Sequence, residues 1–130
     1  PTIEGLTTAG AQTYSVQLGR YIRVGNRVDL VCHIAMSAKD GATAGNLQIA
    51  GLPFTSRTLA NFFWSFAIGY QTSFDLNVAG GFYSMGAILG SAATVIRLFE
   101  VGDNVVTTNL TDADLAATSA IALTGTYFIN

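Results

Sequence analysis

The stretch YIRVGNRVDLVCHIAMS, residues 21–37, decides the fold class. Successive residues of a β-strand point to opposite faces. Within residues 28–36 every second residue is apolar, so one face of this strand is predicted to be buried. That apolar row consists of Val28, Leu30, Cys32, Ile34 and Met36. Gly25 and Asn26 precede the strand, and glycine accepts the positive φ that the first position of a two-residue hairpin turn requires. We therefore predict that residues 14–24 and 27–37 pair as an antiparallel hairpin.

The segment GNLQIAGLPFTS, residues 45–56, contains the next strand. Its apolar residues alternate with polar neighbours, which predicts a half-buried strand. Gly51 then permits a backbone bend that other residues adopt only at a cost, and Pro53 lacks the N–H that a continuing ladder needs. We predict that the strand ends here, with Leu52 and Phe54 anchored on either side of the bend, in the core or at an axis between subunits.

Short alternating runs fill the remainder of the chain. The run NFFWSFAIGY places five aromatic and apolar residues on one predicted face, namely Phe62, Trp64, Phe66, Ile68 and Tyr70. Further strands are predicted within residues 80–90, 94–101 and 121–129, and residues 1–12 form either an arm or an edge strand. Many short strands with regular turns are typical of a β-sandwich. We predict an all-β, antiparallel, jelly-roll-like sandwich, with residues 1–130 as one domain.

One short helical turn is predicted near residues 111–116. Thr111 can cap it, and Asp114 stands three positions later, where the acid of a capping box belongs. Asp112 and Asp114 could also be considered as paired carboxylates. Acids in a first helical turn offset the helix dipole, however, and this local role accounts for both of them.

The composition points to an assembly. Charged residues make up 11% of the 130 residues, against about 25% in a typical soluble domain. A small subunit with so few charges exposes apolar surface, and large apolar patches mark contact surfaces. The net charge is −2 and Lys39 is the one lysine, so the basic footprint of a nucleic-acid-binding protein is missing. The longest apolar run, residues 59–70, falls short of the ~20 residues that span a bilayer, so we expect no membrane insertion.

The sequence offers little for catalysis. Cys32 and His33 are the conventional nucleophile and base, but neighbours on a strand point to opposite faces and cannot form a dyad with each other. One histidine cannot build a zinc site without acidic partners, and none can be located for it. We expect no enzymatic activity, no cofactor and no metal. Glycoside hydrolysis needs only two carboxylates at a suitable separation, so it stays an alternative.

The aromatic residues between Phe62 and Tyr70 have three interpretations. They can form the core, because each aromatic side chain buries about 150–250 Å². They can form an interface between subunits, where aromatic residues are enriched. They can also form a platform for stacking sugars, for which Trp64 and Tyr70 are best suited because they combine an apolar face with a polar edge.

Three segments together resemble the C-terminal β-domain at the tips of tailed-bacteriophage tail fibres and tailspikes. The resemblance rests on a glycine–tyrosine–arginine hairpin, a strand that ends in Gly-Leu-Pro-Phe, and an aromatic last strand. The matching residues are Gly19, Tyr21, Arg23, Val24, Gly25 and Asn26, then Ile49, Gly51, Leu52, Pro53 and Phe54, and finally Gly125, Thr126, Tyr127 and Phe128. In this family the motif residues are turn and packing residues rather than catalytic ones.

The resemblance implies a homotrimer on the surface of a virion. We therefore expect a receptor-binding module of a tail fibre or tailspike that attaches to host surface polysaccharide or lipopolysaccharide and contacts other virion proteins. Within its variable middle segment, the candidate glycan contacts are Trp64, Tyr70, Gln71 and Asp75. The alternative is a structural role, as a capsid decoration (cement) protein or as a trimerisation module of a longer spike.

Overall fold

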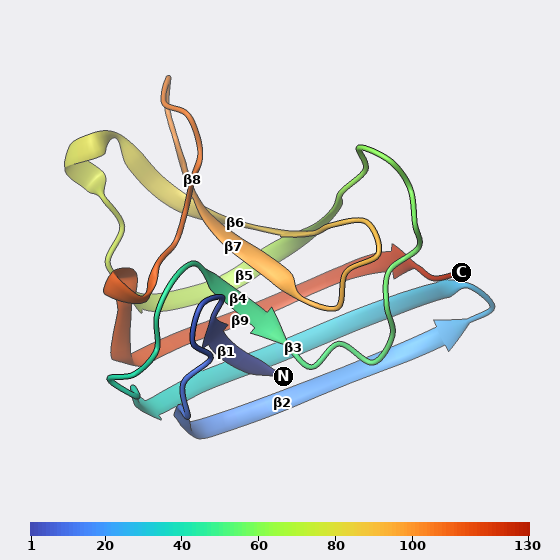
Figure 1. Cartoon of the computed structure of the whole chain (residues 1–130), viewed down its shortest axis with the longest axis horizontal. Helices are drawn as coiled ribbons and strands as arrows, with labels where there is room; N and C mark the ends of the chain where they lie inside the picture. The colour runs from blue at the N-terminus through green and yellow to red at the C-terminus, as the bar shows by residue number, and fades with distance from the viewer.

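The computed structural model describes residues 1–130 and shows one antiparallel sheet of nine strands (Figure 1). Along the sheet the strands follow the order β1-β4-β7-β6-β5-β9-β3-β2, and β8 pairs with β7 outside this path. The elements are β1 (Thr2–Gly5), β2 (Thr13–Val24), β3 (Arg27–Ala38), β4 (Leu47–Ala50), β5 (Trp64–Phe74), η1 (Val78–Gly80), β6 (Phe82–Leu89), β7 (Ile96–Gly102), β8 (Thr108–Asn109), η2 (Asp112–Asp114) and β9 (Leu115–Phe128). The prediction of an all-β antiparallel chain is confirmed.

The long hairpin of β2 and β3 forms as predicted. Its turn is Gly25-Asn26, with Gly25 at φ +59°, and Val24 pairs with Arg27 across it. The apolar row of β3 faces inward and is buried along its whole length. It joins a core cluster of 21 buried residues, most of them from the inner faces of β3, β9, β5, β6, β7 and β4, with Ile3 of β1, Leu110 and Ile129 completing it.

The two separate sheets of a sandwich are not observed. The single sheet curls until its edge strands β1 and β2 face each other, which gives a nearly closed barrel. Side chains bridge the remaining seam. The Tyr14 hydroxyl accepts a hydrogen bond from the Ile3 N–H at 3.0 Å, and the Gln17 side chain donates to the Pro1 carbonyl at 2.9 Å. Alternation could not distinguish these two architectures, because each strand of either one has a single inner face.

The strand of the Gly-Leu-Pro-Phe segment, β4, lies deeper than predicted. A half-buried strand implies an exposed polar face, but the polar Gln48 of β4 is buried. Its amide donates to the Glu4 carboxylate at 2.9 Å, from the adjacent position on β1. Residues 1–12 thus supply an edge strand, one of the two alternatives expected for them. This strand pairs with β4 along its outer edge.

The aromatic strand β5 begins at Trp64, so Phe62 and Phe63 lie in the loop before it. A register shift interrupts its pairing with β9 between Ile68 and Tyr70. The extra residue of such a β-bulge turns the following side chains to the other face. Tyr70 is therefore exposed on the outside, and the prediction that it shares the inner face with Trp64 was wrong.

The short helical turn is confirmed as η2. The Asp114 carboxylate accepts hydrogen bonds from the Thr111 N–H at 2.7 Å and from the Thr111 hydroxyl at 2.9 Å. The turn ends at Asp114, and residue 115 already begins β9. Two small elements were not predicted, the single turn η1 and the two-residue strand β8.

Candidate functional site

The predicted glycan contacts do not lie together. Trp64 is only 5% exposed and belongs to the core, so its indole offers no free face for a sugar. Tyr70 is 51% exposed on the outside of β5. Together with Gln71 it lines a shallow depression of about 240 Å³. Asp75 is exposed beyond the end of β5, where its N–H donates to the Asp114 carbonyl at 2.9 Å.

The residues of the hairpin and Gly-Leu-Pro-Phe motifs converge on one ring. Tyr21 meets the ring of Phe54 edge-on, with centroids 5.5 Å apart, and the Arg23 guanidinium lies 5.1 Å from the same centroid. The Tyr127 hydroxyl donates to the Phe54 carbonyl at 3.1 Å. Three segments that are distant in sequence therefore hold the loop after β4 against the long hairpin.

The bend before Phe54 depends on Gly51. Its φ is +85°, and a Cβ at this position would lie 3.3 Å from the Pro1 Cα. Both the conformation and the neighbouring strand end favour glycine here. Leu52 is half-buried and packs against the core, which is one of the two locations predicted for it.

The main surface feature is an apolar area on the outside of the sheet. We name it the outer sheet face and define it by exposed residues of β2, β3, β9 and β5, namely Leu18, Ile22, Val31, Thr124 and Tyr70. The strand register aligns them in rows across the sheet. Leu18 lies opposite His33, which lies opposite Ala122, and Ala122 lies opposite Tyr70.

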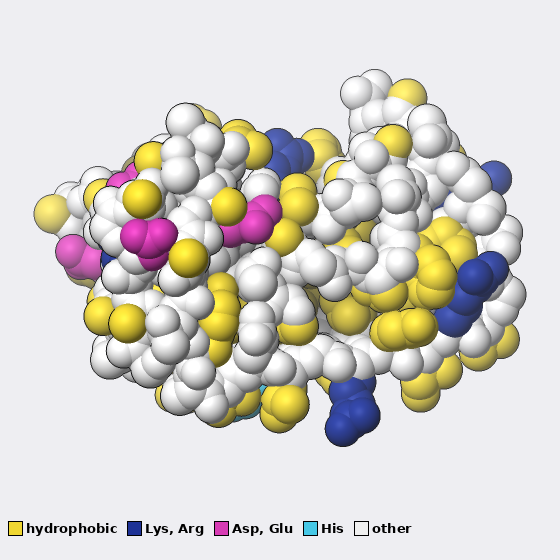
Figure 2. All heavy atoms as spheres, turned by 60° about the horizontal axis from the view of Figure 1, so that its bottom comes forward, with side chains coloured by type: hydrophobic (Ala, Val, Ile, Leu, Met, Phe, Trp, Pro, Cys, Tyr) yellow, Lys and Arg dark blue, Asp and Glu magenta, His cyan; other side chains and the backbone are white.

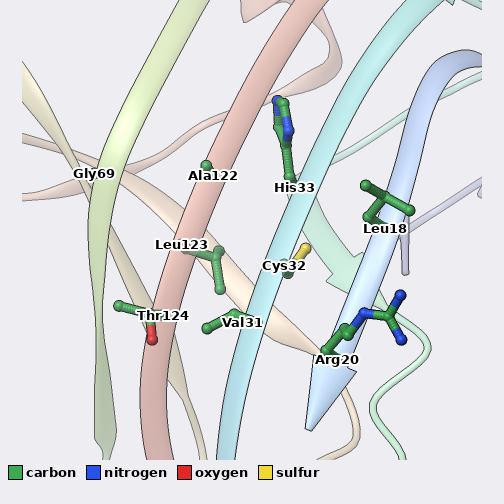
Figure 3. Close-up of a pocket in the computed structure, with 9 residues that line it drawn as sticks. All are labelled: Leu18, Arg20, Val31, Cys32, His33, Gly69, Ala122, Leu123 and Thr124. Carbon is green, nitrogen blue, oxygen red and sulfur yellow. The ribbon is translucent and has the colours of Figure 1, made fainter.

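A hollow of about 470 Å³ lies on this face (Figure 3). Leu18 and Arg20 line it from β2, Val31 and His33 from β3, and Thr124 from β9. Val31 is 52% exposed and Ile22 is 68% exposed, although both are aliphatic. A second hollow of about 320 Å³ continues the same surface towards Asp29 and Thr126. The face is therefore long, apolar and shallow.

The ionisable groups near the hollow do not form a catalytic set. Cys32 points inward and His33 outward, as their positions on a strand require, and burial raises the pKa of the Cys32 thiol to about 11. His33 instead meets the Tyr70 ring edge-on, with centroids 6.3 Å apart. Asp29 accepts hydrogen bonds from the Thr126 hydroxyl and from the Arg27 guanidinium, which hold the pKa of its carboxyl below the usual range. No cluster of three or more histidine, cysteine, aspartate or glutamate side chains could hold a metal ion.

Comparison with solved structures gives a match along the whole chain. The crystal structure of the Dettilon tailspike protein (gp208) superposes with a TM-score of 0.77 and covers 99% of this chain at 23% sequence identity. The chain resembles one domain of a phage tailspike. It spans 22% of the length of that tailspike. No protein-family model and no curated protein matches the sequence.

The tailspike likeness agrees with the family suggested by the sequence motifs. At this level of identity it establishes the fold, which is the nearly closed barrel described above. The chain contains no helix that is long and apolar enough to cross a membrane. The sequence motifs did not reveal the outer sheet face, because its residues come together only when the strands pair.

Proposed function

We propose that this chain is a host-attachment domain on the surface of a tailed-phage virion, acting as a homotrimer that binds bacterial surface glycans. The observation that carries the proposal is the match of the whole chain to one domain of a tailspike. The sequence motifs of the same family support it independently. The domain would sit at the tail, in contact with other virion proteins on one side and with host polysaccharide or lipopolysaccharide on the other.

The outer sheet face supports self-association. It exposes aliphatic side chains on β2 and β3 and continues over β9 and β5 through Thr124 and Tyr70, and the chain as a whole has only 11% charged residues. Exposed apolar surfaces of this kind mark interfaces. Arg20 is the one unpaired charge near its centre, since Arg27 and Asp29 neutralise each other at 2.9 Å. We assign the contact between copies to this face.

Trimerisation would also account for useful affinity towards a glycan. Single sugar sites are weak, and linking three of them raises the effective concentration of the second and third binding events. Of the contacts predicted from sequence, Tyr70 lies on the face that we assign to self-association, so the partly exposed Gln71 and the exposed Asp75 remain as candidates. We expect binding without cleavage of the polysaccharide.

The test is retention of the protein on polysaccharide and lipopolysaccharide extracted from a panel of bacterial strains. We expect binding to material from at least one strain, and weaker binding by a variant that cannot trimerise. No retention on any extract would contradict the attachment role. A stable trimer that binds none of them would instead support the structural alternative, and release of reducing ends would contradict the expectation of binding alone.

A further inference from the structure

The charges of the barrel are divided between its two ends. The arginines lie on the half that carries the β2–β3 turn, the loop before β5 and the β6–β7 turn. Acidic residues gather in the loops and turns at the opposite end, namely Asp40, Asp75, Asp103, Asp112 and Asp114. Figure 2 shows this separation, with most magenta groups on the left and most dark-blue groups in the middle and on the right. The net charge is only −2, but the positive and negative charges are separated between the two ends of the barrel.

Four of the five arginines have no acidic partner, and Arg57 and Arg97 are two of them. The one ion pair of the chain is Arg27–Asp29, so Arg57 and Arg97 keep their guanidinium groups free. Both side chains are exposed. Arg97 lies opposite Gln48, and Glu4 lies one strand further along the row, where it accepts a hydrogen bond from Gln48. Free guanidinium groups offer planar, paired N–H donors that match a carboxylate.

An aromatic side chain lies beside Arg97. Phe63 is 52% exposed, and the Arg97 guanidinium lies 5.7 Å from the centroid of its ring. Phe62 is also exposed and meets Trp64 edge-on at 5.0 Å, so its position is fixed by the core. An exposed ring next to a cation suits a sugar that carries a negative charge, because the apolar face of the sugar can stack while its acid pairs with the arginine.

The loop that carries Arg57, Phe62 and Phe63 is held in place. The Ser56 hydroxyl donates to the Gly90 carbonyl at 2.6 Å and accepts from the Ala93 N–H at 2.9 Å. The Arg57 N–H donates to the Phe128 carbonyl at 2.7 Å, and the Leu59 N–H donates to the Ser91 hydroxyl at 2.9 Å. A loop that is already ordered loses less entropy when it binds a ligand.

We propose that this end of the barrel, defined by Arg57, Phe62, Phe63 and Arg97, binds an acidic polysaccharide whose repeating units carry carboxylates. This inference rests on the proposed attachment function and names its ligand class and site. The two arginines come from different segments, so they suit a polymer with successive charges. The acidic opposite end repels the same polymer, which directs it to the arginine end.

The test is binding of the full chain to polygalacturonate, a carboxylate-bearing polysaccharide, with neutral dextran and phosphate-rich lipopolysaccharide as parallel probes. We expect wild type to bind polygalacturonate and not dextran. The double variant Arg57→Gln/Arg97→Gln should lose about tenfold in affinity, which corresponds to about 1.4 kcal/mol. Lys39→Gln is the control for removal of a positive charge at the acidic end, and it should leave binding unchanged.

A second variant tests the aromatic contact. Phe63→Ala should weaken binding, and Phe63→Tyr should preserve it because the ring remains. Circular dichroism establishes that each variant is folded. Unchanged binding by the folded arginine variant, or binding of wild type to lipopolysaccharide alone, would overturn the proposed site or ligand while the attachment role stands. Failure of wild type on every bacterial extract would instead count against the attachment role itself.

Discussion

The Tyr14 hydroxyl joins the two edges of the sheet through both backbone groups of Ile3. It accepts from the Ile3 N–H at 3.0 Å and donates to the Ile3 carbonyl at 3.2 Å. Strands β1 and β2 share no backbone ladder, so this side chain takes over the bonds that a closed barrel would form between them. Burial raises the pKa of the Tyr14 hydroxyl, which keeps it protonated and able to donate.

Tyr14→Phe should therefore lower the free energy of unfolding. It leaves two partly buried backbone groups without their partner, for which a cost of about 1–3 kcal/mol is expected. Urea unfolding followed by circular dichroism measures the change. Tyr83→Phe is the control, because Tyr83 is exposed and its hydroxyl makes no hydrogen bond within the chain. Equal stability of the Tyr14 variant and the control would show that the seam is not held by this hydroxyl.

Gly51→Ala should destabilise the chain more than the same change at Gly41. The backbone of Gly51 has φ +85°, where an L-residue costs about 1–2 kcal/mol, and its new Cβ would meet Pro1 at 3.3 Å. Gly41 has open space around it and no positive φ. Thermal unfolding of both variants measures the difference. If glycan binding fell in the Gly51 variant while its melting temperature stayed at the wild-type value, the structural role of this bend would be refuted.

Cys32 should resist thiol reagents in the native protein. Its side chain is buried and its pKa is raised to about 11, so the reactive thiolate is scarce at neutral or mildly alkaline pH. An Ellman assay should detect labelling only after denaturant is added. Rapid labelling of the native protein would mean that the inner face of β3 opens to solvent.

The ionised carboxylate of Asp29 should stabilise the folded chain at neutral pH, and this stabilisation should be lost at acidic pH. The Thr126 hydroxyl and the Arg27 guanidinium favour its charged form and lower its pKa in the folded state. Its contribution is therefore present above the unfolded pKa of about 3.9 and is lost as the pH falls through the lower folded value. The difference in urea midpoint between wild type and Asp29→Asn should shrink as the pH is lowered through this range. A difference that is independent of pH would contradict the role of the charge.

The sequence was most informative where period and turn chemistry agreed. The β2–β3 hairpin followed from the alternation of residues 28–36 and from Gly25, and the capped turn followed from Thr111 and Asp114. Tyr70 was placed on the wrong face because a single bulged residue reverses the alternation, and nothing in the local pattern marks where a bulge occurs. Strand β8 is too short for any periodicity.

The surfaces were less predictable than the strands. Val31 and Leu18 are far enough apart in sequence that only the register of β2 and β3 shows them on one face. Arg57 lies in the loop before β5 and Arg97 lies on β7. The separation of positive and negative charges between the two ends of the barrel is therefore seen only in three dimensions. From the sequence, Trp64 was a candidate for stacking against a sugar, but its side chain packs in the core instead.

Sedimentation equilibrium at micromolar concentration shows whether copies of the chain bury their outer sheet faces against one another. We expect a species of about three times the chain mass of 13.6 kDa. Val31→Asp should reduce it to the monomer, while Val106→Asp, at an exposed loop position away from that face, should leave the trimer intact. A wild-type protein that sediments as a single species of 13.6 kDa would contradict the account.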